Sequence, residues 1–512
     1  MIHGGNAAAP VAKGRAIMGT MTFLLPPELS AEAAQELTRA CIAGGPDNMP
    51  WPTRVRHEAG RLTVERDVDE SGYLVVPWEV NGSGRLMTTT ATLMERPLAY
   101  YLPVELARGK VNQLRCQAAD WEAGGLKVPA DLDEDIRKAG ALFGQAVTEG
   151  NPEQKAAQAR AALELSHCAA QKLTQLYVTQ VFGARHARDP RLDTIMGCRL
   201  GGNPAKEELD QLVPLANSVC IPFTWSLIEP GEGSFNCQQI DALLDWAEDH
   251  KLAVTAGPVL DFSSTQLPDW LWLYERDLQS LRKFMANYLG KMVKRYHRRI
   301  RRWQLTCASN SSSVLSLGEE ELLWLTVNMV QAARQVDADL ELVVGISQPW
   351  GEYMAVEERT HSPFIFADTL VRSELKLSSL DLELVMGVTP RGSYCRDLLE
   401  TSRMLDLYAL LGVPLGVTLG LPSSAAPDPM ADPEQRVGAG HWLGCVSAGV
   451  QADWAAAFAS LATCKPYVKA VNWTHLSDNE PHQFPHCGLL DSARRPKPAL
   501  KQLQLLRENH LR

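Results

Sequence analysis

The sequence predicts an α/β protein in which a closed (β/α)₈ barrel follows a small β-sandwich-like domain and a helical connector. Two observations predict the barrel. Eight short apolar runs occur after residue 190, and a stretch of helical periodicity follows each of them. Strands that alternate with helices pair in parallel, and eight such units close into a barrel. The eight runs are residues 194–200, 217–223, 252–260, 302–308, 340–347, 380–387, 413–420 and 467–474.

The chain before the barrel predicts three further segments. Residues 1–16 are expected to form a flexible arm. Residues 17–125 are expected to form a β-rich, sandwich-like domain with a terminal helix, because apolar runs alternate with Gly, Asn, Asp and Pro turns until helical periodicity begins near residue 103. Residues 126–190 are alanine-rich and predict a helical hairpin connector, with Asn151 and Pro152 between its helices. Residues 191–512 are expected to form the barrel.

Composition excludes several classes of partner. The net charge of −10 disfavours a nucleic-acid-binding surface, which needs a basic field. No apolar run approaches the ~20 residues of a membrane span, and the opening residues lack the apolar segment of a signal peptide. The eleven cysteines are scattered and never spaced as CxxC, which is typical of reduced thiols. We therefore expect a cytoplasmic protein without nucleic-acid or membrane partners; the sequence leaves its oligomeric state open.

Several short motifs follow one another in order along the barrel. They are WSLIEPGEGSF at residues 225–235, GPVLD at 257–261, PDW at 268–270, RWQL at 302–305, VNW at 471–473, GLLD at 488–491 and PKPA at 496–499. From about residue 194 to the C-terminus, the chain thereby resembles the family-10 glycoside hydrolases, the xylanase-type barrels. The resemblance implies a saccharide substrate or ligand and a site at the carboxyl ends of the strands.

The two catalytic positions of that family do not carry acids here. The resemblance implies one glutamate at the end of the fourth strand and another at the end of the seventh, about 5–5.5 Å apart in a retaining enzyme. Ala308 occupies the acid/base position and Leu419 the nucleophile position. Shifting the alignment to the family by a few residues does not place an acid at either position, because residues 278–318 and 407–427 contain no Asp or Glu. The usual two-glutamate mechanism is therefore not available.

The polar groups that the family uses to bind sugar have changed as well, and other carboxylates remain near strand ends. The sugar-binding positions implied by the resemblance hold Cys220, Ile221, Thr224, Pro258, Ser263, Gly345 and Ile346. Alternative catalytic acids are Asp261, Glu352 and Glu383. Glu383 alternates with apolar residues and could face either the barrel interior or the helices.

Aromatic residues give a second functional signal. Flat rings suit the apolar faces of sugars, and several rings fall at or just beyond predicted strand ends, although core packing is the alternative for each. The expected substrate-binding residues are Trp225, Phe262, Asn310, Trp350, Tyr353, Trp442, Trp473 and His475.

The histidines near the C-terminus do not predict a metal site. His475, His482 and His486 lie close in sequence to Cys487, but Pro481 and Pro485 prevent a shared helix face. We expect loop histidines, no metal and no cofactor.

Three functions follow from these observations. The first is a catalytically degenerate barrel that binds a β-linked poly- or oligosaccharide. The second is an active glycosidase with relocated carboxylates. The third is a non-catalytic scaffold, in which the N-terminal segments mediate assembly.

Overall fold

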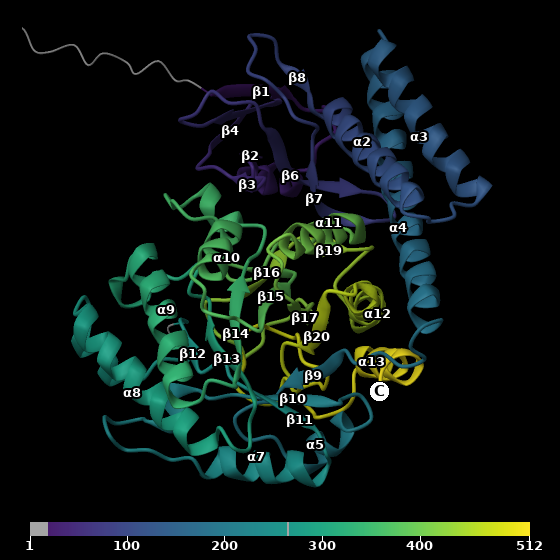
Figure 1. Cartoon of the computed structure of the whole chain (residues 1–512). Helices are drawn as coiled ribbons and strands as arrows, with labels where there is room; N and C mark the ends of the chain where they lie inside the picture. The colour runs from purple at the N-terminus through teal and green to yellow at the C-terminus, as the bar shows by residue number, and fades with distance from the viewer. Residues whose placement is uncertain (1–18, 264–265) are drawn as a thin grey trace, which may run out of the picture.

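Residues 19–263 and 266–512 are described by a computed structural model (Figure 1). The predicted arm, residues 1–16, lies outside the described residues. A β-rich region and three long helices come first, and a barrel with surrounding helices follows. In Figure 1 the β-rich region lies above the barrel, next to helix α11 (Leu398–Ala409).

The predicted barrel is confirmed. The parallel strands run in the order β11-β10-β9-β20-β17-β15-β14-β13, and β11 pairs with β13, so the sheet closes on itself. Their bounds are β9 Ile195–Arg199, β10 Ser218–Ile221, β11 Ala253–Ala256, β13 Arg302–Cys307, β14 Glu341–Ser347, β15 Ser379–Val385, β17 Leu415–Gly420 and β20 Val468–Trp473. Each lies within its predicted run or within one residue of it.

The third predicted strand is interrupted. It divides into β11 and a short β12 (Leu260–Asp261), because Pro258 has no N–H to donate and Gly257 adopts a positive φ of 111°. β12 then pairs with the end of β13. This break turns residues 258–261 towards the mouth of the barrel.

Helices cover the outside of the strands, as the alternation requires. Every residue of β15 and β17 is buried, which is typical of parallel strands with both faces covered. Side chains of Asp277, Ser362, Asp397 and Ser447 cap helix N-termini. The helices are α5 Lys206–Leu212, α6 Trp225–Ile228, α7 Gln238–Asp249, α8 Leu278–Tyr296, α9 Glu319–Val336, α10 Pro363–Arg372, α11, α12 Ala448–Cys464 and α13 Pro498–His510.

The β-rich N-terminal region contains two sheets, and one of them includes a strand from the barrel. The first has the order β4-β5-β1-β8 and the second β19-β7-β6-β2-β3. Strand β19 (His441–Trp442) comes from the long loop after β17 and pairs antiparallel with β7. The other strands are β1 Thr20–Leu24, β2 Cys41–Gly44, β3 Met49–Pro50, β4 Arg54–Glu58, β5 Arg61–Glu65, β6 Tyr73–Val80, β7 Gly84–Thr89 and β8 Tyr100–Tyr101.

Three long helices connect this region to the barrel. They are α2 (Leu102–Ala123), α3 (Ala130–Thr148) and α4 (Pro152–His186), and the side chain of Asn151 caps α4. Helix α4 packs on α2 and α3 and extends to the barrel helices α11 and α12 (Figure 1). At its far end the ring of Phe182 stacks on that of His510 in α13, with centroids 3.9 Å apart.

A buried ionic cluster joins these helices to the barrel. The ammonium of Lys110 in α2 lies 2.5 Å from the carboxylate of Asp397, and His167 Nδ1 in α4 lies 3.1 Å from the same carboxylate. Burial opposes the ionisation of Asp397, but Lys110 and His167 hold its pKa well below the usual value. The same carboxylate caps α11, so one acid fixes three helices.

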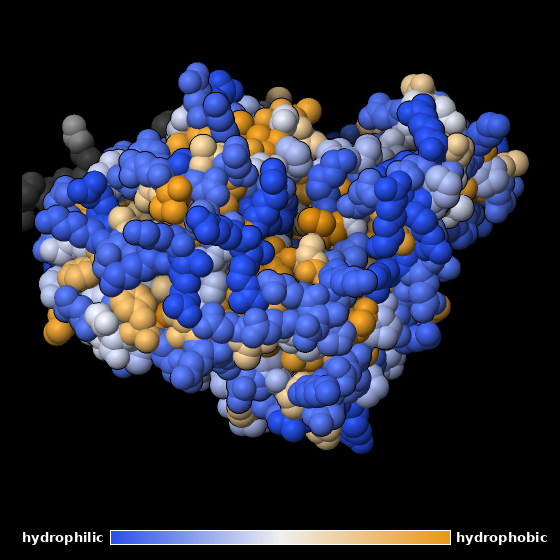
Figure 2. Space-filling view, turned by 60° about the horizontal axis from the view of Figure 1, so that its bottom comes forward, coloured by the Kyte–Doolittle hydropathy of each residue, from blue (hydrophilic) through white to orange (hydrophobic). Residues whose placement is uncertain are grey.

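Within the described residues, no helix is long and apolar enough to cross a bilayer. Figure 2 shows that hydrophilic side chains cover most of one face of the molecule, with hydrophobic residues in small groups between them.

Candidate functional site

A cavity of about 600 Å³ opens at the carboxyl ends of β9, β10 and β20. This is the end of the barrel where chemistry is performed in such folds. Arg199 ends β9, Asp261 ends β12, and His475 follows β20, and all three line the cavity. Residues 430–433, from the loop after β17, complete one wall. The apolar part of the lining includes Leu200, Pro204, Pro222, Leu227, Pro258, Val259 and Pro433.

The two positions expected to be catalytic are apolar and lie outside this lining. Ala308 follows β13 directly, is buried and has a positive φ of 58°, which starts a turn. Leu419 is buried in β17, in register with Leu384 and Trp473 on the neighbouring strands. Both positions thus fall at the strand ends that the resemblance implied, but neither offers a proton or a nucleophile.

Glu383 projects into the barrel rather than towards the helices. The hydroxyl of Ser347 on β14 donates to its Oε2 at 2.9 Å, and Arg199 Nη1 lies 3.9 Å from its Oε1. Because β9 and β15 are not neighbours in the sheet, this second contact crosses the barrel interior. Burial raises the pKa of Glu383, although the charge of Arg199 partly offsets the effect.

A second interior acid, Asp381, was not singled out from the sequence. It lies two residues before Glu383 on β15 and therefore faces the same side. The hydroxyl of Thr418 donates to its Oδ2 at 2.7 Å, and burial raises its pKa. In the sequence, Asp381 and Glu383 alternate with apolar residues, which places both acids on one face of the strand. The structure shows that this face is the barrel interior.

The three alternative catalytic acids are not brought together. Asp261 lines the cavity and accepts hydrogen bonds from the backbone N–H and the hydroxyl of Ser263, at 3.0 and 2.7 Å. Glu352 lies outside the lining, where it accepts the backbone N–H of Tyr394 and pairs with Arg396. Of the three acids, Asp261 alone contacts the cavity.

The aromatic residues that were expected to bind substrate at the mouth of the barrel are buried in the structure. Trp225 lines the cavity but is only 1% exposed, because Tyr288 stacks on it with centroids 4.7 Å apart and its indole N–H donates to Glu229. The other rings are buried and outside the cavity lining; they belong to Phe262, Trp350, Tyr353, Trp442 and Trp473. Helices and loops cover these rings because burial of so much apolar area is favourable.

Asn310 is also buried outside the lining. Its amide donates to the carbonyl of Ser347 at 2.8 Å and accepts from the N–H of the same residue at 3.0 Å. This pairing bridges the loops after β13 and β14. Of the eight residues expected to bind substrate, Trp225 and His475 contact the cavity.

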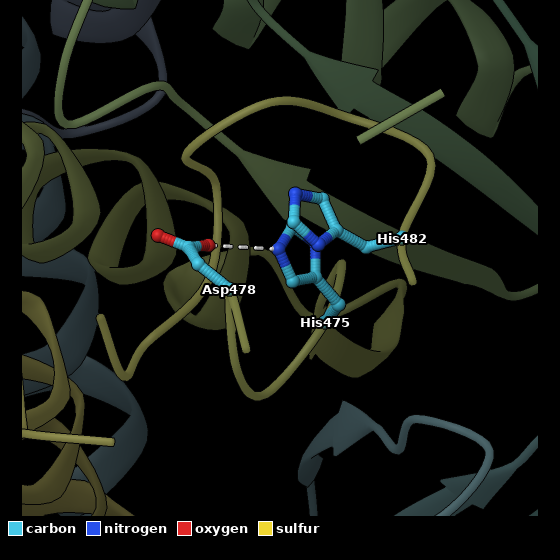
Figure 3. Close-up of side chains that lie close together, drawn as sticks. All are labelled: His475, Asp478 and His482. Carbon is cyan, nitrogen blue, oxygen red and sulfur yellow. Dashed lines mark hydrogen bonds and ion pairs between the residues drawn. The ribbon is translucent and has the colours of Figure 1, made fainter. Parts of the chain in front are cut away.

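A cluster of histidines and aspartates lies beside the cavity (Figure 3). The Nε2 of His475 lies 3.1 Å from Asp478 Oδ1, and the ring of His475 stacks on that of His482 with centroids 4.3 Å apart. Burial, together with His482, lowers the pKa of His475 to about 4, so its ring is neutral at pH 7. The sequence analysis expected loop histidines here but did not link them to Asp478, because irregular loops, not a helix, bring the residues together.

The cluster is satisfied by hydrogen bonds. Ligand atoms of His475, Asp478 and His482 lie within 4.8 Å of one another, so these residues could hold a metal ion. However, the Lys497 ammonium lies 2.6 Å from Asp478 Oδ2, and the N–H of Gly488 donates to Oδ1. Burial opposes the ionisation of Asp478, but His475 and Lys497 hold its pKa low. A divalent ion would therefore compete with a buried ammonium for this carboxylate.

Both ring nitrogens of His482 also face oxygen atoms. Its Nδ1 lies 2.7 Å from the carbonyl of Glu480, and its Nε2 lies 3.1 Å from Asp428 Oδ2. The residues thus fit a loop-bracing network better than a set of metal ligands.

Part of the chain is similar to a known protein family. Residues 205–308 match the sequence model of the family described as Glycosyl hydrolase family 10. Similar solved structures include xylanase 10B from Thermotoga petrophila RKU-1 in complex with xylobiose, at 16% identity and a TM-score of 0.46, over 62% of this chain and 94% of that chain. A GH10 xylanase from Thermobacillus composti has 16% identity and a TM-score of 0.46, over 64% and 99%. The GH10 structure from Paenibacillus barcinonensis has 16% identity and a TM-score of 0.48, over 65% of this chain and 98% of that chain.

The closed parallel sheet and its surrounding helices define a (β/α)₈ barrel, and the cavity opens at the carboxyl ends of the strands. More particularly, the part of the barrel from just before α5 to the residue after β13 is similar to glycosyl hydrolase family 10. The matched segment ends at Ala308.

Proposed function

We propose that this protein binds a β-linked oligo- or polysaccharide in the cavity at the mouth of the barrel and does not hydrolyse it by the two-glutamate route. One contrast carries the proposal. The cavity has polar groups at the ends of β9 and β12, whereas the expected catalytic positions, Ala308 and Leu419, are buried and apolar. Binding needs only the first feature, and retaining hydrolysis needs a pair of carboxylates.

The chemistry of the lining supports a saccharide. Arg199 supplies hydrogen-bond donors and Asp261 supplies acceptor atoms, while prolines and Leu227 supply apolar surface. Sugars combine hydroxyls with apolar C–H faces, and such a mixed lining can satisfy both. The volume of about 600 Å³ lies within the usual range of roughly 300–1,000 Å³ for small-molecule sites.

An active glycosidase with relocated carboxylates remains the alternative. It would have to use Asp261 with Glu383, because Glu352 is held by Arg396. Glu383 lies outside the cavity lining and next to Arg199, which makes it a poor proton donor to a ligand in the cavity. A scaffold function has weaker support, because it leaves the polar cavity unused.

Binding and turnover are measured separately on the full chain. We expect calorimetry with xylohexaose or another β-linked hexasaccharide to detect binding, and Asp261→Asn to weaken it about tenfold or more, since a hydrogen bond to a charged acceptor is lost. Asp269→Asn is the matched control, because Asp269 is exposed and outside the cavity lining.

Reducing-end assays on the same ligands should show no release above buffer. Release that disappears in both Asp261→Asn and Glu383→Gln would establish the glycosidase instead. Absence of binding to a broad glycan array would leave the scaffold. A cytoplasmic location, which the scattered cysteines favour, belongs to the same proposal.

A further inference from the structure

Arg199 is a largely buried charged group of the cavity, and its side chain makes no hydrogen bond among the described residues. It is the last residue of β9, its side chain is 14% exposed, and it lines the cavity. A guanidinium has five N–H donors in a planar fork. None of them makes a hydrogen bond with the residues that the structure describes; the nearest carboxylate atom in an ion pair is Glu383 Oε1, at 3.9 Å.

The neighbouring acids do not fill this fork. Glu383 Oε1 is itself buried without a hydrogen-bond partner among the described residues, so the two groups face each other without bonding. Burial raises the pKa of Glu383, and the charge of Arg199 lowers it in part. Burial also opposes the charge of Arg199, but groups that become negative when they ionise, namely Cys307, Glu383 and Asp261, outweigh burial and raise the pKa of Arg199. The guanidinium stays charged, as arginine does in proteins.

The other acids of the cavity accept hydrogen bonds from loop residues. Asp261 Oδ1 accepts the N–H and hydroxyl of Ser263. Asp432 accepts the N–H of Glu434 at 2.9 Å, and Glu480 accepts the N–H of Asn203 at 3.0 Å. Burial raises the pKa of Glu480.

Arg199 is the permanently charged cation of the cavity. Among the described residues that line the cavity, Arg199 is the one arginine, and there is no lysine. The histidines of the lining are His475 and His482, and the ring of His475 is neutral at pH 7 because its pKa is lowered to about 4. Arg199 is therefore the group of this cavity best suited to an anionic group of a ligand.

We propose that the ligand of this cavity is an acidic saccharide whose oxyanion forms a two-point hydrogen-bonded pair with Arg199. The inference rests on the proposed function and gives it a ligand class. A uronate carboxylate is the best match, because its two coplanar oxygens fit the planar fork bidentately. A sulfate ester offers the same oxyanion chemistry without the planar match.

The test compares ligands that differ in one group. Calorimetry on the full chain uses a neutral xylo-oligosaccharide, the same oligosaccharide carrying one glucuronate, and one carrying one sulfate ester. We expect the uronate ligand to bind about tenfold tighter than the neutral ligand or better, since a charge-assisted pair forms. The advantage should shrink as salt rises, though less than for an exposed pair.

Variants assign the preference to Arg199. Arg199→Met should abolish the uronate preference while changing neutral binding less, and Arg199→Lys should keep part of it. Arg298→Met is the matched control, because Arg298 is exposed and outside the cavity lining. If Arg199→Met does not fold, the wild-type comparison and Arg199→Lys still decide the question.

The outcomes are distinct. Equal affinity for the neutral and uronate ligands, or a preference that survives in Arg199→Met, overturns the inference and leaves the proposed glycan binding intact. A tighter sulfate ligand assigns the oxyanion to sulfated saccharides and overturns the uronate match. Absence of binding to all three ligands and to a glycan array overturns the proposed function itself.

Discussion

Replacing Lys110 by methionine tests how the N-terminal helices are held to the barrel. Lys110 on α2 contacts Asp397 at 2.5 Å and Gln113 at 2.6 Å, and His167 on α4 contacts the same carboxylate. Glu400 on α11 is the other acid that faces the cluster. Loss of one partner from a buried ion pair costs about 3–5 kcal/mol, because the remaining charge is left without compensation. We expect that loss at pH 7.5.

The same substitution changes the pH dependence of stability. Burial and then Lys110 lower the pKa of His167, so the unfolded chain binds this proton more readily. Folded wild-type protein therefore loses stability through His167 as pH falls below about 6.5, the value for an unfolded histidine. Without Lys110 the pKa of His167 rises, so the variant loses less stability through His167 as pH falls below about 6.5. The difference from wild type in this acid-dependent loss is at most about 1.4 kcal/mol per pH unit. The gap between variant and wild type should thus be smaller at pH 5.5 than at pH 7.5.

The measurement is denaturant unfolding of both proteins at pH 7.5, 6.5 and 5.5. Lys138→Met on α3 is the control, since Lys138 is exposed, and it should change stability by less than about 0.5 kcal/mol at every pH. A loss under about 1 kcal/mol in Lys110→Met, or a gap that is constant with pH, would refute the role of the cluster. The other histidines titrate in both proteins and cancel in the difference.

Three more predictions concern the barrel. Leu419→Glu places a carboxylate at a position that is 1% exposed, so it should lower the unfolding free energy by more than about 2 kcal/mol. It should not create glycoside hydrolysis. The control Leu410→Glu, at a position that is 78% exposed, should change neither the unfolding free energy nor the hydrolysis assay appreciably. Trp225→Ala removes a stacked ring and should cost about 3–5 kcal/mol in chemical unfolding, against a small cost for the partly exposed Trp272→Ala; equal costs would contradict the packing role. The pKa of Glu383 is raised in the folded state, so ionisation of this carboxyl lowers the stability of the folded protein as pH rises through that pKa. Glu383→Gln should therefore have a higher melting temperature than wild type at pH 8 but not at pH 4. The opposite order would show that the charge of Glu383 is needed for stability.

Predictions from the sequence succeeded where they depended on local pattern. The eight strands follow from apolar runs of strand length between helical stretches. The aromatic residues show the limit of this reasoning. Phe262 and Trp473 do fall at strand ends, but the position along a strand does not say whether a loop covers the ring. Burial is a property of the packed molecule.

Candidate site residues divide in the same way. Asp261 was expected at the mouth of the barrel and lines the cavity, because the carboxyl end of a strand fixes that position. Arg199 was overlooked, although a single charge that ends an apolar run is a visible signal. Glu352 looked similar to Asp261 in sequence, since both lie at or just beyond the end of a predicted strand. The fold instead pairs Glu352 with Arg396, so Glu352 lies outside the cavity lining.

The sequence by itself determined the (β/α)₈ architecture and the lack of acids near the ends of β13 and β17, because periodicity and composition are properties of the linear chain. Only the tertiary structure decided that Arg199 meets Glu383 across the barrel, that β19 completes an N-terminal sheet, and that His475, Asp478 and His482 share one cluster. Each of these contacts needs the closed sheet or an irregular loop to bring together residues that no local pattern links. Ala308 and Leu419 show that this barrel lacks the family's two catalytic acids, and the fold places Arg199 in the lining of its cavity.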